Sequence, residues 1–303
     1  MIMKEIPEDF CVKEISKLEF NEKGRYHYYL LKKRNYNTLD AISKISERLK
    51  IDTKRVGYAG NKDKFAITEQ YISIKDYKVN SLRLKDIELT FVGKGSKPIL
   101  LGDLEKNRFR ITVRGLDKKK NGKINWIINY FDEQRFGGNN IETGKKILKN
   151  DFNDLDKPKT LLMLYVHSVQ SYIWNKTVEE YLKEKSDIKI KYNHGYFIFP
   201  KGRIKNEKIP LVGYLTVIKN KKIENIIYKI INKEEIKLSD FLIQKLPKLS
   251  QKGEERDLIV SVGNFNVKYL KDDLSKNKYK AIFDFVLPKG VYATLVIKRF
   301  FKQ

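Results

Sequence analysis

Residues 56–70 have the sequence VGYAGNKDKFAITEQ, which predicts a short apolar strand, a polar turn and a second strand. Gly57 and Gly60 precede the turn, and glycine at such positions allows a ligand to approach the backbone closely. Asp63 lies in the turn between two lysines, and neighbouring cations favour the ionised carboxylate that a nucleophile or general base requires. Asp63 is therefore a candidate catalytic residue. The alternative is an aspartate that only supports an ordinary turn.

The composition of the chain indicates a folded protein with an anionic partner. Its 303 residues suffice for two domains, and 41% hydrophobic residues exclude a disordered chain. The 63 Lys+Arg against 38 Asp+Glu leave a formal net charge of +25 at pH 7. Such an excess predicts binding to nucleic acid or to an acidic membrane, unless it only reflects a lysine-rich proteome.

Several classes of site are missing from the sequence. Cys11 is the single cysteine and the three histidines are far apart, so neither a disulfide framework nor a metal site is expected. No P-loop, dinucleotide fingerprint or G-x-S-x-G motif occurs, so no cofactor is expected. No secretory signal is visible, and no apolar stretch approaches the ~20 residues that span a bilayer. We therefore expect a soluble cytoplasmic protein.

The segment around Phe109 predicts a strand with one basic face. Phe109, Ile111 and Val113 alternate with polar residues, and a period of two places alternate residues on opposite faces of a sheet. The arginines of the polar face are Arg108, Arg110 and Arg114. They are candidates for contacts with RNA phosphates, the alternative being a solvated outer face.

Apolar periodicity predicts further elements along the chain. The predicted helices span residues 37–49, 124–131 and 163–182. The predicted strands of the tail span residues 258–262, 281–286 and 291–298. The lysine-rich stretch at 118–123 is expected to lie near a domain boundary.

The stretch at residues 56–70 resembles the signature A-G-x-K-D-x-x-A-x-T-x-Q of the TruD family of tRNA pseudouridine synthases. Further family motifs follow in the family's order: Lys4 with Pro7–Val12, Arg34–Thr38, Asn107–Phe109, Asn129–Gly137 and Leu287–Thr294. Because these motifs extend over nearly the whole chain, it is identified as a member of this family. The departures from the family pattern are Asp132 for glycine, Val291 for serine and Gln170 for arginine.

The resemblance implies an α+β fold in two parts. A pseudouridine-synthase catalytic core, with a mixed and largely antiparallel sheet, would comprise residues 1–125 and 261–303. A smaller α/β insertion, the TRUD domain, would comprise residues 126–260. This insertion diverges most from the family, and we expect it to govern substrate choice.

The resemblance also implies the reaction. The family isomerises uridine to pseudouridine in tRNA, at uridine 13 of the D arm, with no cofactor and no metal. Asp63 holds the motif position of the nucleophile, which would attack either the ribose C1′ or the base C6, and Lys4 would be the cation held against it. The alternatives are the same chemistry at another RNA position and a non-catalytic protein that binds or folds tRNA. The expected partner is structured RNA, with no membrane, and the chain is expected to be a monomer.

The residues that fall where the family contacts the flipped target nucleotide are Phe10, Asn107 and Tyr292, with Phe109 and Phe131 as aromatic neighbours. Unstacking a base costs free energy, and an aromatic ring can return about 1–3 kcal/mol per stacked base. The amide of Asn107 can both donate to and accept from a uracil edge. The alternatives are core packing for Phe10, a turn for Asn107 and a strand aromatic for Tyr292.

Overall fold

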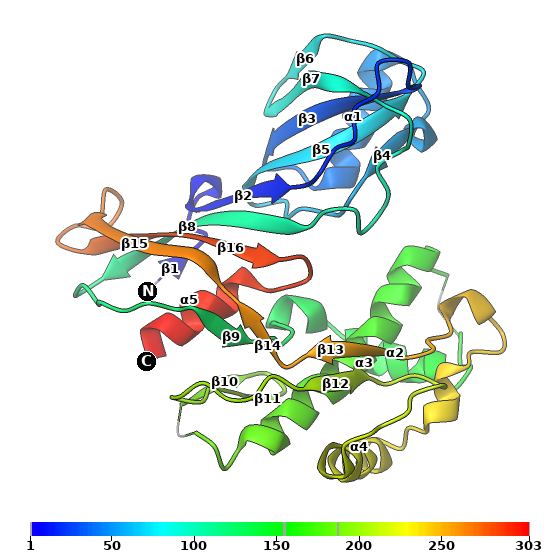
Figure 1. Ribbon diagram of the computed structural model, residues 1–303, viewed down its shortest axis with the longest axis vertical. Coiled ribbons are helices and arrows are strands. Elements are labelled where there is room, and N and C mark those ends of the chain that lie inside the picture. The colour runs from blue at the N-terminus through cyan, green and yellow to red at the C-terminus, as the bar shows by residue number, and fades with distance from the viewer. Residues whose placement is uncertain (1, 154–155, 187, 303) are drawn as a thin grey trace. The chain divides into compact units, whose positions relative to one another are not determined.

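The computed structural model describes residues 2–153, 156–186 and 188–302. The chain divides into two compact units (Figure 1). The first unit contains residues 1–125 and 261–290, and the second contains residues 126–260 and 291–303. Residues 291–303, which we expected in the same domain as residues 261–290, therefore group with the second unit.

Within the described residues, a ten-stranded sheet forms the first unit, in the order β15-β16-β8-β2-β5-β3-β7-β6, with β1 paired to β8 and β4 to β5 (Figure 1). β2 and β5 run parallel, whereas the other neighbours in this order run antiparallel. This arrangement confirms the predicted α+β class with a mixed, largely antiparallel sheet. The strands are β1 (Ile2–Met3), β2 (Phe10–Ile15), β3 (Tyr26–Arg34), β4 (Val56–Tyr58), β5 (Ile67–Lys75), β6 (Ser81–Leu84), β7 (Ile87–Gly95), β8 (Lys106–Leu116), β15 (Gly263–Lys271) and β16 (Tyr279–Pro288).

α1 (Thr38–Leu49) covers one face of this sheet, which we call the inner face. Asn37 caps the helix by accepting a hydrogen bond from the backbone N–H of Asp40 at 2.8 Å. Ile42 and Ile45 recur at helical spacing and are buried against β3, β4, β5 and β7. The predicted helix at 37–49 is thereby confirmed.

The register of the strands assigns side chains to the two faces of the sheet. Val12 of β2 lies opposite Phe109 of β8 and Thr68 of β5, so these three side chains share a face. That face is the inner one, which α1 covers over β5 and β3. Arg108 and Arg110 point to the opposite, outer face, because successive residues of a strand alternate.

Helices predominate in the second unit, with short strand pairs beside them (Figure 1). α3 packs against α2, α4, β11 and β12, and its Trp174 is fully buried, with edge contacts to Tyr130 at 6.1 Å and Phe131 at 5.9 Å. The helices are α2 (Asn140–Leu148), α3 (Lys159–Leu182), α4 (Lys221–Lys233) and α5 (Ala293–Lys302). The strand pairs are β9 (Trp126–Ile128) with β14 (Ile259–Ser261), β10 (Lys189–Tyr192) with β11 (Gly195–Ile198), and β12 (Lys208–Leu211) with β13 (Glu254–Asp257).

Two predicted elements are wrong. The helix predicted at 124–131 is instead the short strand β9, and the strand predicted at 291–298 is instead the helix α5. β-branched residues favoured a strand in the tail, but tertiary packing overrides that propensity. Thr294 and Lys298 both bond the carboxylate of Asp132, the lysine at 2.6 Å, and so fasten the helix to the segment after β9.

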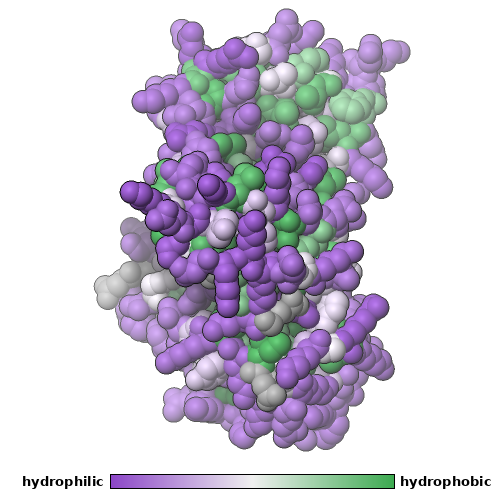
Figure 2. All heavy atoms as spheres, turned by 90° about the vertical axis from the view of Figure 1, so that its left-hand side faces the viewer, coloured by the Kyte–Doolittle hydropathy of each residue, from purple (hydrophilic) through white to green (hydrophobic). Residues whose placement is uncertain are grey.

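Hydrophilic side chains predominate on the face of the molecule drawn in Figure 2, and hydrophobic side chains show there only in small patches. No helix within the described ranges is long and apolar enough to cross a membrane.

Candidate active site and nucleotide-binding residues

Asp63 lies in the loop between β4 and β5, and a buried hydrogen-bond network holds that loop. The hydroxyl of Thr38 accepts from the backbone N–H of Lys62 at 2.9 Å and donates to the Gln70 side chain at 2.8 Å. Gln70 in turn donates to the backbone oxygen of Gly60 at 3.1 Å. Because α1 and β5 supply these partners, the loop is anchored on rigid elements directly beside Asp63.

Lys33 supports the same loop from inside the sheet. Its side chain is buried, with 1% of the residue exposed, and its Nζ donates to the backbone oxygens of Tyr36 at 2.5 Å and Asp63 at 3.0 Å. Burial lowers the pKa of Lys33 to about 8, although the negative charge of Asp63 acts in the opposite direction. These carbonyl oxygens accept hydrogen bonds from the buried ammonium group of Lys33, which would be costly to bury without them.

The two lysines beside Asp63 in the sequence have different surroundings. Lys62 forms a buried ion pair with Glu14 of β2 at 2.9 Å, and Lys64 is exposed. The Nζ of Lys4 lies 2.6 Å from Asp63 Oδ2, which makes an ion pair between the two side chains. The sequence neighbours suggested a positive environment, but the fold supplies it from a residue 59 positions away.

Lys4 connects Asp63 to the aromatic residues of the inner face. Its Nζ lies 3.8 Å from the ring centroid of Phe10, a cation–π distance. The ring of Phe10 meets that of Phe109 edge-on at 6.2 Å. The structure thus brings together four of the predicted residues, Lys4, Asp63, Phe10 and Phe109, within the first unit.

Asn107 lies on the inner face of β8, two residues before Phe109 and opposite Glu14. Its side-chain oxygen is buried and has no hydrogen-bond partner among the described residues. A buried acceptor without a donor costs about 1–3 kcal/mol, so the free carbonyl is suited to a ligand N–H. Asn107 therefore lies on the same strand and the same face as Phe109, which is another predicted site residue.

Tyr292 and Phe131 lie in the second unit and contact each other. Their ring centroids are 6.1 Å apart, and the backbone N–H and C=O of Phe131 bond the Asn175 side chain at 3.0 and 2.8 Å. The guanidinium of Arg256 lies 4.0 Å from the Phe131 ring centroid. Burial raises the pKa of Tyr292, and the positive charges of Arg135 and Arg256 oppose that rise. Phe131 is almost fully buried, so it contributes to the core of this unit.

The three predicted phosphate-contacting arginines separate into two environments. Arg108 and Arg110 are exposed on the outer face, opposite to Phe109, and both lie near Asp284, at 2.8 and 3.6 Å. The prediction that Arg114 belongs to an open basic face is wrong, because its side chain is only 4% exposed. The carboxylates that enclose it are Asp9 at 2.9 Å, Asp272 at 2.8 Å and Asp273 at 2.7 Å.

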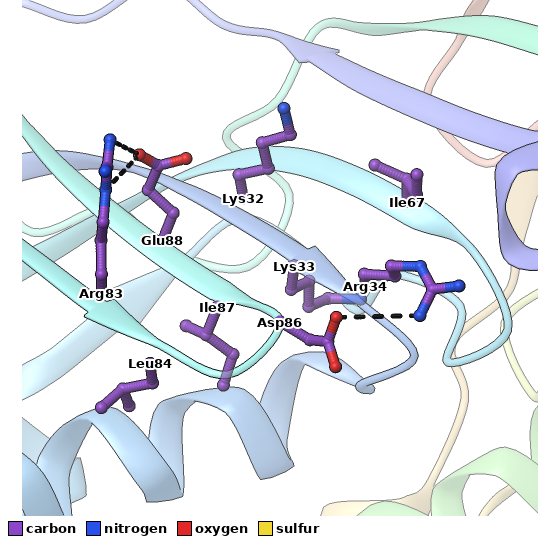
Figure 3. A pocket seen from close by; sticks show the side chains of 9 residues that line it. All are labelled: Lys32, Lys33, Arg34, Ile67, Arg83, Leu84, Asp86, Ile87 and Glu88. Carbon is purple, nitrogen blue, oxygen red and sulfur yellow. Dashed lines mark hydrogen bonds and ion pairs between the residues drawn. The ribbon is translucent and has the colours of Figure 1, made fainter.

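A cavity of about 320 Å³, lined by residues of β3, β6 and β7 with Ile67 of β5, is a less suitable site (Figure 3). Its arginines already face carboxylates, Arg34 with Asp86 at 3.7 Å and Arg83 with Glu88 at 3.0 Å. Lys32 extends away from these two pairs (Figure 3). An anionic ligand would therefore find little uncompensated positive charge in this cavity.

The sequence model of the family described as tRNA pseudouridine synthase D (TruD) matches residues 1–157 and 203–300. The chain belongs to the TruD family. It is 31% identical to a protein named probable tRNA pseudouridine synthase D 1 from Methanococcus maripaludis, over 97% of each chain. It is 30% identical to a tRNA pseudouridine synthase D from Aquifex aeolicus, over 99% of this chain and 97% of that protein. A crystal structure of the putative TruD from Methanosarcina mazei superposes with a TM-score of 0.70 at 25% identity, covering 99% of this chain and 93% of that one.

These comparisons confirm the family that the sequence motifs predicted, and pseudouridine synthases are isomerases.

Sequence reasoning missed the residues that support the loop of Asp63. Thr38, Lys62 and Gln70 stand inside motifs that the resemblance had already singled out, so their motif positions were an available signal. Lys33 and Glu14 carried no such signal, because only the fold reveals that these charged residues are buried beside the loop.

Proposed function

We propose that the protein converts uridine to pseudouridine at position 13 of the D arm of tRNA, with Asp63 as the nucleophile. The observation that carries this proposal is the contact of Asp63 with Lys4 at 2.6 Å, on a loop with the family signature. A cation at this distance favours the ionised carboxylate, which is the nucleophilic form. No cofactor is needed, because the reaction is an isomerisation of the nucleotide itself.

The proposed reaction breaks the bond between N1 of uracil and C1′ of the ribose, and forms a bond between C5 and the same C1′. The hydrogen at C5 is lost and N1 gains one, so that the overall composition of the nucleotide is unchanged. Asp63 would form a transient covalent bond with either C1′ or C6. Lys4 would balance the carboxylate charge before attack and after release.

The nucleotide contacts follow from the chemistry of the residues. The buried Oδ1 of Asn107 would accept a hydrogen bond from N3–H of uracil, which would satisfy it. Phe10 and Phe109 would present aromatic edges and faces to the flipped base. Tyr292 keeps the role of nucleotide contact that its motif position implies, and the buried ring of Phe131 would lie behind it.

The decisive experiment maps pseudouridine chemically on a transcribed tRNA after incubation with the protein. We expect product at position 13 from the unaltered chain and none from Asp63→Asn, with tRNA affinity changed only a few-fold. Asp117→Asn, an exposed aspartate of the same unit, is the matched control and should keep full activity. Product from Asp63→Asn would overturn the proposed nucleophile.

The same map decides between the remaining candidates. Product at another position would retain the chemistry and replace the proposed target. Binding of tRNA without any pseudouridine would favour a non-catalytic role in tRNA binding or folding, for which the charge of +25 is the supporting observation. A cytoplasmic monomer is the form in which we expect the enzyme to act.

A further inference from the structure

A cavity of about 470 Å³ lies among residues of the second unit, between η3 (Glu133–Phe136), α3 and the segment that leads into β13. Its polar lining includes Arg135, His167, Gln170, Lys252 and Arg256. Every lining residue falls between 131 and 256, so the cavity is a property of this unit alone. The loop of Asp63 belongs to the other unit.

Arg135 has donor capacity that the protein does not use. Its Nε is buried and has no hydrogen-bond partner among the described residues. A buried donor without an acceptor destabilises a fold unless a ligand or water completes it. The planar fork of arginine matches the paired oxygens of a phosphate or carboxylate.

The charges around the cavity favour an anion. Arg135, Lys252 and Arg256 contribute positive charge, against the single exposed carboxylate of Glu254. Burial lowers the pKa of His167, and the charge of Arg135 lowers it further, against the opposing effects of Gln251 and Glu254. Arg256 is held in place by hydrogen bonds to the backbone and side chain of Asn129, at 3.0 and 2.6 Å. The cavity is therefore preorganised around positive charge.

We propose that this cavity binds a phosphodiester group of the tRNA backbone, with Arg135 as its principal donor. The proposal rests on the proposed function, because that function supplies the RNA. Phosphate contacts of this kind fix the position of an RNA without reading its sequence.

The first experiment uses inorganic phosphate as the probe and follows the imidazole signals of His167 by NMR. Phosphate bound beside Arg135 should raise the pKa of His167, because an anion stabilises the imidazolium. The response should disappear in Arg135→Gln. Signals of His167 that do not respond to millimolar phosphate in the unaltered chain would overturn the proposal. Signals that respond equally in both chains would overturn the role of Arg135.

The second experiment separates RNA phosphate from free phosphate. Saturating tRNA should shift the NMR signals of His167 and abolish their response to inorganic phosphate. If the response to phosphate is unaltered in the tRNA complex, the cavity does not hold the RNA backbone. Arg135→Gln should weaken tRNA binding about tenfold. It should also reduce, by about 1, the magnitude of the slope of the logarithm of the association constant against the logarithm of the salt concentration. Arg203→Gln, which removes an exposed arginine of the same unit outside the cavity, is the matched control and should change both much less.

Two further measurements keep the outcomes distinct. Lys252→Gln alters an exposed side chain of the cavity and gives the same comparison if Arg135→Gln does not fold. Pseudouridine formation by the unaltered chain is measured on the same tRNA. If product forms but neither cavity variant differs from Arg203→Gln, the cavity proposal fails and the proposed function stands. If no product forms, the proposed function fails, and the phosphate titration still decides whether the cavity binds an anion.

Discussion

Lys33 donates a hydrogen bond to the backbone oxygen of Asp63 at 3.0 Å, from a position inside the core of the first unit. The side chain of the same aspartate bonds Lys4 at 2.6 Å. One residue is thus held by two lysines with different tasks. Lys33 fixes the loop through its backbone, and Lys4 sets the charge around the carboxylate. Neither lysine is adjacent to Asp63 in the sequence.

Lys4→Met should slow pseudouridine formation while leaving the fold intact. The variant loses a charge-assisted hydrogen bond to Asp63, and such a bond contributes about 1.5–3 kcal/mol, which corresponds to roughly 10- to 100-fold in rate. Single-turnover rates on transcribed tRNA measure the effect. Lys64→Met, which alters the exposed lysine next to Asp63, is the control and should stay near the unaltered rate. Equal losses in the two variants would contradict a specific role for Lys4.

Lys33 should make stability depend on pH in the alkaline range. Its pKa is about 8 in the folded chain, and an unfolded lysine has a pKa of about 10.4. Between these values the unfolded chain binds more protons, so the free energy of unfolding contributed by this group rises with pH. In urea unfolding, the free energy of unfolding of the unaltered chain should rise by roughly 1–3 kcal/mol relative to that of Lys33→Met between pH 7.5 and about 10. A constant difference between the two chains would contradict the lowered pKa.

Glu14→Gln should destabilise the first unit, because it leaves the charge of Lys62 buried without its partner. Breaking a buried ion pair from one side costs about 3–5 kcal/mol. Adding Lys62→Met removes the stranded charge and should recover most of the loss. Urea unfolding of the single and double variants gives the coupling energy. Additive losses would show that the pair at 2.9 Å contributes no coupling.

Arg114→Met should act on stability, because three carboxylates would lose their common cation. We expect a loss of about 3–5 kcal/mol, whereas Arg108→Met should stay within about 0.5 kcal/mol, as exposed substitutions usually do. Thermal unfolding measures both. If Arg114→Met instead left the stability unchanged and reduced the salt dependence of tRNA binding, the original prediction of a phosphate contact would be restored.

The sequence predicted the α+β class, the family and the alternation of residues 109–114, because each of these depends on local order along the chain. It also predicted the pairing of Lys4 with Asp63, through motif position and not through any local pattern. The sequence could not show that Asn107 has a buried oxygen without a partner, because that depends on what surrounds β8. The alternation did predict that Arg108 and Arg110 lie on the face opposite to Phe109, and the structure confirms it.

The sequence by itself determined the position of the candidate nucleophile, Asp63, and the strongly basic character of the chain. The tertiary structure decided which basic residues serve which purpose. Arg114 shares the alternation of Arg108 but is enclosed by Asp9, Asp272 and Asp273, from distant parts of the chain. Periodicity fixes the face on which a side chain lies, whereas burial and charge pairing depend on segments that only the folded chain brings together.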